Sequence, residues 1–132
     1  MNDGENPHVW FSAEVRKAVA QAITKAYKQV DAAKKNDFDK MNDQWTAEEN
    51  NVESKIAEVK QKTDGLAYAA TESVASYLAK DMGLADATPS GYARATANES
   101  EPTPTDIKQF TDALKAGEIK LLVVNTQEES EL

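Results

Sequence analysis

Residues 36–62 contain neither proline nor glycine, and their large apolar side chains recur at intervals of three, four or seven positions. That spacing keeps one face of a helix apolar along its whole length. At about 1.5 Å per residue such a helix would be roughly 38 Å long, which is more than a small lobe requires. We therefore predict one uninterrupted helix over 36–62 that bridges two parts of a structure.

A second amphipathic helix is predicted before it, from Ser12 to about Val30. Val15, Val19 and Ile23 recur every four residues with charged residues between them, which is the pattern of a helix with one apolar face. Ser12 is a suitable N-cap for this helix.

After Gly65 the sequence changes to an alternation of strands and helices. The predicted elements are a strand at 66–71, a helix at 73–82, a weaker strand candidate at 92–96 (YARAT), a helix at 104–116 and a strand at 119–125. The helix at 104–116 has a capping box, with Thr103 as N-cap and Asp106 three residues later. The last strand, in IKLLVVN, is continuously apolar, which suits a strand covered on both faces. The order β-α-β-α-β after a long helix indicates an α/β fold with a parallel sheet.

Charge and composition exclude several classes of partner and site. The chain has 132 residues, with 15 Lys and Arg against 23 Asp and Glu, giving a net charge of −8. Nucleic acids and anionic membranes are bound by clustered positive charge, so we expect neither as a main partner. The sequence has no cysteine, which excludes disulfides, thiolate nucleophiles and cysteine-based zinc sites.

His8 is the only histidine in the chain, and it lies between Pro7 and Trp10 just before the first predicted helix. A neutral imidazole at such a position is suited to bind a first-row transition metal. The residues alone favour the other interpretation, a surface or half-buried histidine at the start of a helix. Both interpretations remain open at this point.

Glu72 follows the strand predicted at 66–71, and ligands of open parallel sheets bind at the carboxyl ends of strands. Its carboxylate could ligate a cation, or it could simply interact favourably with the positive end of the dipole of the next helix. Asn125, Thr126 and Gln127 follow the last predicted strand, where their side chains could orient a ligand or cap a loop; we favour the cap.

Other recognisable site motifs are missing. The acidic segment at 97–106 lacks the alternating Asp/Asn pattern and the glycine of an EF-hand, so we interpret it as a turn and a capping box. The sequence has no Gly-x-Ser-x-Gly, no glycine-rich phosphate loop and no His-Glu-x-x-His. We therefore do not expect an enzyme.

Several segments, in order, resemble the metal-specific solute-binding proteins of ABC transporters, which deliver zinc, manganese or iron. They are NPHVW, the long helix, ATESVASYLAKDMGL, SEPTPTDIKQFTDAL and IKLLVVNTQ. The resemblance covers nearly the whole chain. It implies two α/β lobes joined by a long helix, with the metal ion in the cleft between the lobes.

Under this resemblance, His8 is the imidazole ligand from the first lobe and Glu72 is a ligand from the second lobe. Residues 1–35 would be the last segment and helix of the first lobe, 36–62 the linking helix, and 63–132 a partial second lobe. The implied partners are the metal ion and the membrane permease, and the implied location is outside the cytoplasm, as a periplasmic protein or a cell-surface lipoprotein.

The chain departs from the family pattern in three respects. We find no first-lobe strands that would supply another histidine, no end of the second lobe that would supply an aspartate, and neither a signal peptide nor a lipid-anchor cysteine. We therefore expect an internal fragment that carries part of the ligand set, binds metal weakly and self-associates to cover its open edges. The alternative hypothesis is a helical and α/β interaction module that binds no metal.

Overall fold

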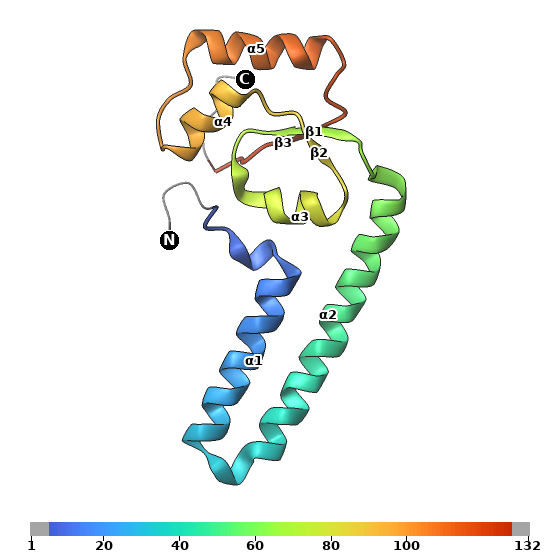
Figure 1. Ribbon diagram of the computed structural model, residues 1–132, viewed down its shortest axis with the longest axis vertical. Coiled ribbons are helices and arrows are strands. Elements are labelled where there is room, and N and C mark those ends of the chain that lie inside the picture. Colours follow the sequence, from blue (N-terminus) through green and yellow to red (C-terminus); the bar gives the residue numbers. More distant parts are fainter. Residues whose placement is uncertain (1–5, 128–132) are drawn as a thin grey trace.

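The computed structural model describes residues 6–127, which form a long helical hairpin attached to a small α/β lobe (Figure 1). A 3-10 turn (Val9–Phe11) leads into the two hairpin helices, α1 (Ala13–Val30) and α2 (Lys35–Thr63), which a second 3-10 turn (Ala32–Lys34) connects. The predicted uninterrupted helix over 36–62 is confirmed, because α2 runs through 29 residues without a break. Ser12 caps α1 as predicted, with its hydroxyl accepting from the Val15 amide. Among the described residues, no helix is both long and apolar enough to span a membrane.

Ion pairs join the two hairpin helices. The Arg16 guanidinium binds the buried carboxylate of Glu49, with Nε 3.0 Å from Oε1. Further along the hairpin, Lys28 Nζ lies 2.6 Å and 2.7 Å from the two carboxylate oxygens of Asp39. Glu49 is also the only buried residue of α1 or α2. The two helices are thus joined by ion pairs and by the contact of the Tyr27 and Phe38 rings at 5.4 Å, and neither helix has a buried apolar residue.

The lobe contains a parallel sheet of three short strands, β1 (Ala67–Ala70), β2 (Ala85–Asp86) and β3 (Leu121–Val123), in the order β2-β1-β3. β1 pairs with β3 in the register Tyr68 to Leu121. The parallel pairing predicted for the strands at 66–71 and 119–125 is confirmed, and so is the α/β fold class.

Three helices cover this sheet: α3 (Ser76–Asp81), α4 (Ser90–Ala97) and α5 (Pro104–Lys115). On one face, Ala69 packs with Tyr92 of α4, Phe110 of α5 and Ile119 to form the core. The rings of Tyr92 and Phe110 meet edge to face at 4.8 Å. α5 has the predicted capping box, because the Thr103 hydroxyl accepts from the Asp106 amide and the Asp106 carboxylate accepts from the Thr103 amide.

Two predictions about the lobe are wrong in detail. The strand candidate at 92–96 lies inside α4, where the Thr96 hydroxyl donates to the carbonyl of Tyr92 one turn earlier. The second strand along the chain is instead the two-residue β2, which lies at an edge of the sheet. The last strand is not covered on both faces, because Leu121 and Leu122 are 44% and 37% exposed.

The end of α2 is attached to the lobe at a glycine turn. The Gly65 amide donates to the Gly83 carbonyl at 2.7 Å, and the Thr63 hydroxyl donates to the Met82 carbonyl at 2.7 Å. Gly83 has φ +72, and a Cβ there would come within 3.2 Å of Asp64 Cα. Only glycine fits this conformation and this close approach comfortably.

Candidate metal-binding site

The carboxyl ends of β1 and β3 meet at Thr71, Glu72 and Asn125. The hydroxyl of the buried Thr71 accepts from the backbone amide of Asn125 at 3.0 Å. The side-chain amide of Asn125 donates to Glu72 Oε2 at 2.8 Å. Asn125 Oδ1 also accepts from the Gln127 amide at 3.0 Å. Asn125 therefore caps its loop, as predicted, and in addition it orients the Glu72 carboxylate.

The segment before α1 lies against this end of the lobe. The Asn6 side-chain amide donates to the Ser73 carbonyl at 2.7 Å, and the Tyr77 hydroxyl donates to the Asn6 carbonyl at 3.1 Å. The two residues of each bond are far apart in the sequence, by 67 positions in the first bond and by 71 in the second. They bring the beginning of the described chain to the carboxyl end of β1.

His8 is held in one orientation by the same asparagine. Its Nδ1 lies 2.7 Å from Asn6 Oδ1, and its backbone amide donates to the same oxygen at 3.0 Å. Because an amide oxygen only accepts, Nδ1 carries the proton and Nε2 has the free lone pair. The ring also packs edge to face on Trp10 at 5.2 Å. A metal-binding histidine commonly donates its other nitrogen to a carbonyl oxygen in this manner.

His8 and Glu72 line one hollow of about 820 Å³ between the N-terminal segment and the lobe. Its other walls come from the end of β1, from α4 and from the turn before α5, and they include Glu99 and Glu101. The structure thus brings together the two candidate ligands that the sequence singled out. Over residues 6–127, however, no three histidine, cysteine, aspartate or glutamate side chains are grouped closely enough to hold a metal ion.

Two features of this hollow were missed by sequence reasoning. Asn6 orients His8 and anchors the segment, yet a lone asparagine before a proline gives no signal of such a role. Glu101 was assigned only to a structural turn, but the turn also forms a wall of the hollow. The segment 97–106 does contain the predicted capping box.

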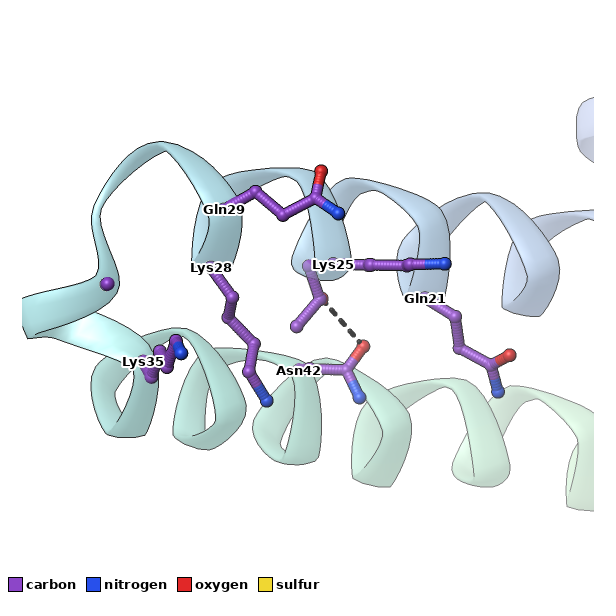
Figure 2. Close-up of a pocket in the computed structure, with 8 residues that line it drawn as sticks. Gln21, Lys25, Lys28, Gln29, Lys35 and Asn42 are labelled. Carbon is purple, nitrogen blue, oxygen red and sulfur yellow. Dashed lines mark hydrogen bonds between the residues drawn. The ribbon is translucent and has the colours of Figure 1, made fainter.

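A second hollow lies between α1 and α2 near the tip of the hairpin (Figure 2). Three lysines, Lys25, Lys28 and Lys35, contribute to its lining together with uncharged polar side chains, and Asn42 accepts from the Thr24 hydroxyl at 3.2 Å. The lining contains no histidine or carboxylate. This hollow therefore offers neither an imidazole nor a carboxylate to a transition metal ion.

The model of one protein family, described as the zinc-uptake complex component A, periplasmic, matches residues 1–132. The comparison with curated proteins gives no match.

Solved structures share the fold. A mutant of the laminin-binding adhesin of Streptococcus agalactiae superposes with a TM-score of 0.72 at 22% identity, over 95% of this chain and 46% of the adhesin. A Zn(II)-bound mutant of AdcAII from Streptococcus pneumoniae has a TM-score of 0.68 at 23% identity. The match covers 90% of this chain and 43% of AdcAII. A Mn-bound mutant of a periplasmic metal-binding protein from Candidatus Liberibacter asiaticus has a TM-score of 0.63 at 19% identity. The match covers 96% of this chain and 46% of that protein. The chain thus spans about half the length of these structures.

Proposed function

Because this chain belongs to the family of the periplasmic zinc-uptake complex component A, we propose that it forms part of an extracytoplasmic solute-binding protein that captures a divalent transition metal ion. In this proposal the ion is cargo, bound between two lobes and then passed to the permease of an ABC transporter. The protein catalyses no reaction.

His8 and Glu72 are the proposed ligands, and their presence in one hollow is the observation that carries the proposal. His8 comes from the segment before α1 and Glu72 from the end of β1, so an ion bound by both would add to the bonds from Asn6 that hold this segment against the lobe. This proximity supports the metal hypothesis over the interaction module, which requires no such arrangement.

The donor types fit several ions. Imidazole and carboxylate ligands suit zinc, manganese and iron alike, and the affinity order of these metals does not by itself decide selectivity. Two of the solved structures are described as bound to Zn(II) and to Mn, which agrees with this range. We propose zinc, manganese or iron as the ion.

Binding by this chain alone should be weak. Tight sites hold three or four ligands in fixed geometry, whereas the proposal assigns two. We expect a Kd weaker than about 1 µM, which corresponds to less than about 8 kcal/mol.

Calorimetry of the purified chain with zinc and with manganese tests the proposal. We expect His8→Ala and Glu72→Ala each to abolish the binding heat, because the remaining ligand would leave the ion almost fully hydrated. Glu58→Ala is the matched control, since Glu58 is an exposed carboxylate on α2 outside the hollow. Binding that is indifferent to both His8 and Glu72 would contradict the assignment, and so would submicromolar binding by a monomer.

A further inference from the structure

Asn6 bonds to both of the segments that carry the candidate ligands. Its Oδ1 accepts from the ring Nδ1 of His8 at 2.7 Å and from the backbone amide of His8 at 3.0 Å. Its Nδ2 donates to the Ser73 carbonyl at 2.7 Å, and Ser73 directly follows Glu72. One side-chain amide therefore lies between His8 and the residue beside Glu72.

The partners of this amide fix which of its ends is the oxygen. A backbone N–H only donates and a carbonyl oxygen only accepts, so Oδ1 must face the His8 amide and Nδ2 must face the Ser73 carbonyl. The His8 ring must then donate to Oδ1 from Nδ1. In a neutral imidazole the hydrogen bond of one nitrogen decides which nitrogen is left to bind a metal. Asn6 thus selects the tautomer whose Nε2 lone pair is available.

The segment that carries His8 is attached on both sides of this residue. On one side, the Tyr77 hydroxyl of α3 donates to the Asn6 carbonyl at 3.1 Å. On the other side, Arg16 Nη1 of α1 donates to the Trp10 carbonyl at 3.1 Å. The position of the His8 ring relative to the lobe and to α1 is therefore set without an ion.

Building on the proposed function, we propose that Asn6 is a positioning residue of the metal site, which holds His8 in its metal-binding tautomer and beside Glu72 before an ion arrives. Asn6 is not itself a ligand, because both lone pairs of its Oδ1 accept hydrogen bonds from His8. Replacing the hydrogen-bond partner of a metal-binding histidine typically lowers metal affinity by about 10–100-fold. We assign an effect of this kind to Asn6.

NMR of the histidine ring tests the proposal without any metal. The chain has one histidine, so long-range ¹H–¹⁵N spectra of the untagged chain report His8 alone. At about pH 9, where a histidine is neutral, the wild type should carry its proton on Nδ1. Asn6→Ala should move the proton towards Nε2, which a histidine without such a partner prefers. Asn6→Asp should keep it on Nδ1, because a carboxylate oxygen still accepts from that nitrogen.

Asn51→Asp is the matched control for the NMR experiment, since Asn51 is exposed on α2 and does not line the hollow. Its spectrum should show the wild-type tautomer. A wild type protonated on Nε2 would overturn the proposal, and so would an Asn6→Ala variant that keeps the wild-type tautomer.

Calorimetry with zinc measures the consequence for binding. Asn6→Ala should raise the zinc Kd at least about tenfold, and Asn51→Ala should leave it unchanged. Tyr77→Phe removes one attachment of the segment but keeps the bonds from His8 to Asn6 Oδ1, so its effect should be smaller than that of Asn6→Ala. Circular dichroism verifies that each variant is folded.

The calorimetry separates two ways of being wrong. A wild type that binds no zinc would contradict the proposed function and this inference together. If the wild type binds zinc through His8 and Glu72 and Asn6→Ala binds it equally well, this inference alone is wrong. A larger loss for Tyr77→Phe than for Asn6→Ala would also overturn it, because the positioning would then come from Tyr77.

Discussion

The lobe and the hairpin bury opposite kinds of side chain. In the lobe, Phe110 and Ala69 are completely buried and form an apolar core with Tyr92. In the hairpin, the only buried residue is Glu49, and the apolar side chains are half-buried or exposed. The lobe thus gains stability from a buried apolar cluster, whereas the hairpin has ion pairs between its helices and no buried apolar side chain.

The largest effect should come from emptying the core of the lobe. Phe110→Ala should lower the free energy of unfolding by about 3–5 kcal/mol, because it leaves a cavity between α5 and β1. Ile23→Ala on the hairpin removes a half-exposed side chain and should cost under about 1 kcal/mol in the monomer. Urea denaturation at low protein concentration measures both. Equal losses would show that the two regions do not differ as described.

An intermediate effect should come from the buried carboxylate of the hairpin. Arg16→Met leaves Glu49 without its guanidinium partner and should cost about 2 kcal/mol, since a buried charge without a partner is unfavourable. Glu49→Gln should cost less, because Arg16 is partly exposed and can be solvated. The double variant should be more stable than the sum of the two losses predicts. Strict additivity, measured by the same denaturation, would show that the ion pair does not hold the hairpin.

A smaller effect than that of Arg16→Met should come from the cap of α5. Thr103→Ala should cost about 1 kcal/mol at neutral pH through loss of the N-cap. The hydrogen bonds from Thr103 lower the pKa of Asp106 in the folded protein. Their contribution to stability is therefore present above the pKa that Asp106 has in the unfolded chain, and it is lost as the pH falls through its lower pKa in the folded protein. The stability difference between wild type and variant should therefore narrow in acid. A difference that widens in acid, measured by thermal melts across pH, would contradict this.

The sequence predicted the long elements because their signals are local and repeated. α2 has an unbroken apolar periodicity. α5 has a capping box and a proline at its beginning and a glycine just after its end. β2 has only Ala85 and Asp86, which is too short for any periodicity. The neighbouring segment at 92–96 alternates like a strand, although its alanines and the preceding Pro89 also favour a helix.

The candidate residues could be chosen from the sequence, but their common location could not. His8 and Glu72 stood out by residue type and by their places before a helix and after a strand, and the family resemblance made them candidate ligands. Their meeting in one hollow depends on Asn6, Ser73 and Tyr77, whose bonds join residues 67 and 71 positions apart, about half the length of the chain. No local pattern encodes such contacts, and so the role of Asn6 became apparent only in the structure.

The glycine turn at the end of α2 has a mechanical consequence. Because Gly65 and Thr63 bond to the segment around Gly83, α2 is clamped to the lobe and acts as a lever fixed at one end. Its 29 residues make an arm of about 43 Å. A rotation of the lobe by about 10° would swing the far end of this arm by about 7 Å. Small rearrangements beside the sheet are thereby amplified into large excursions at the tip of the hairpin.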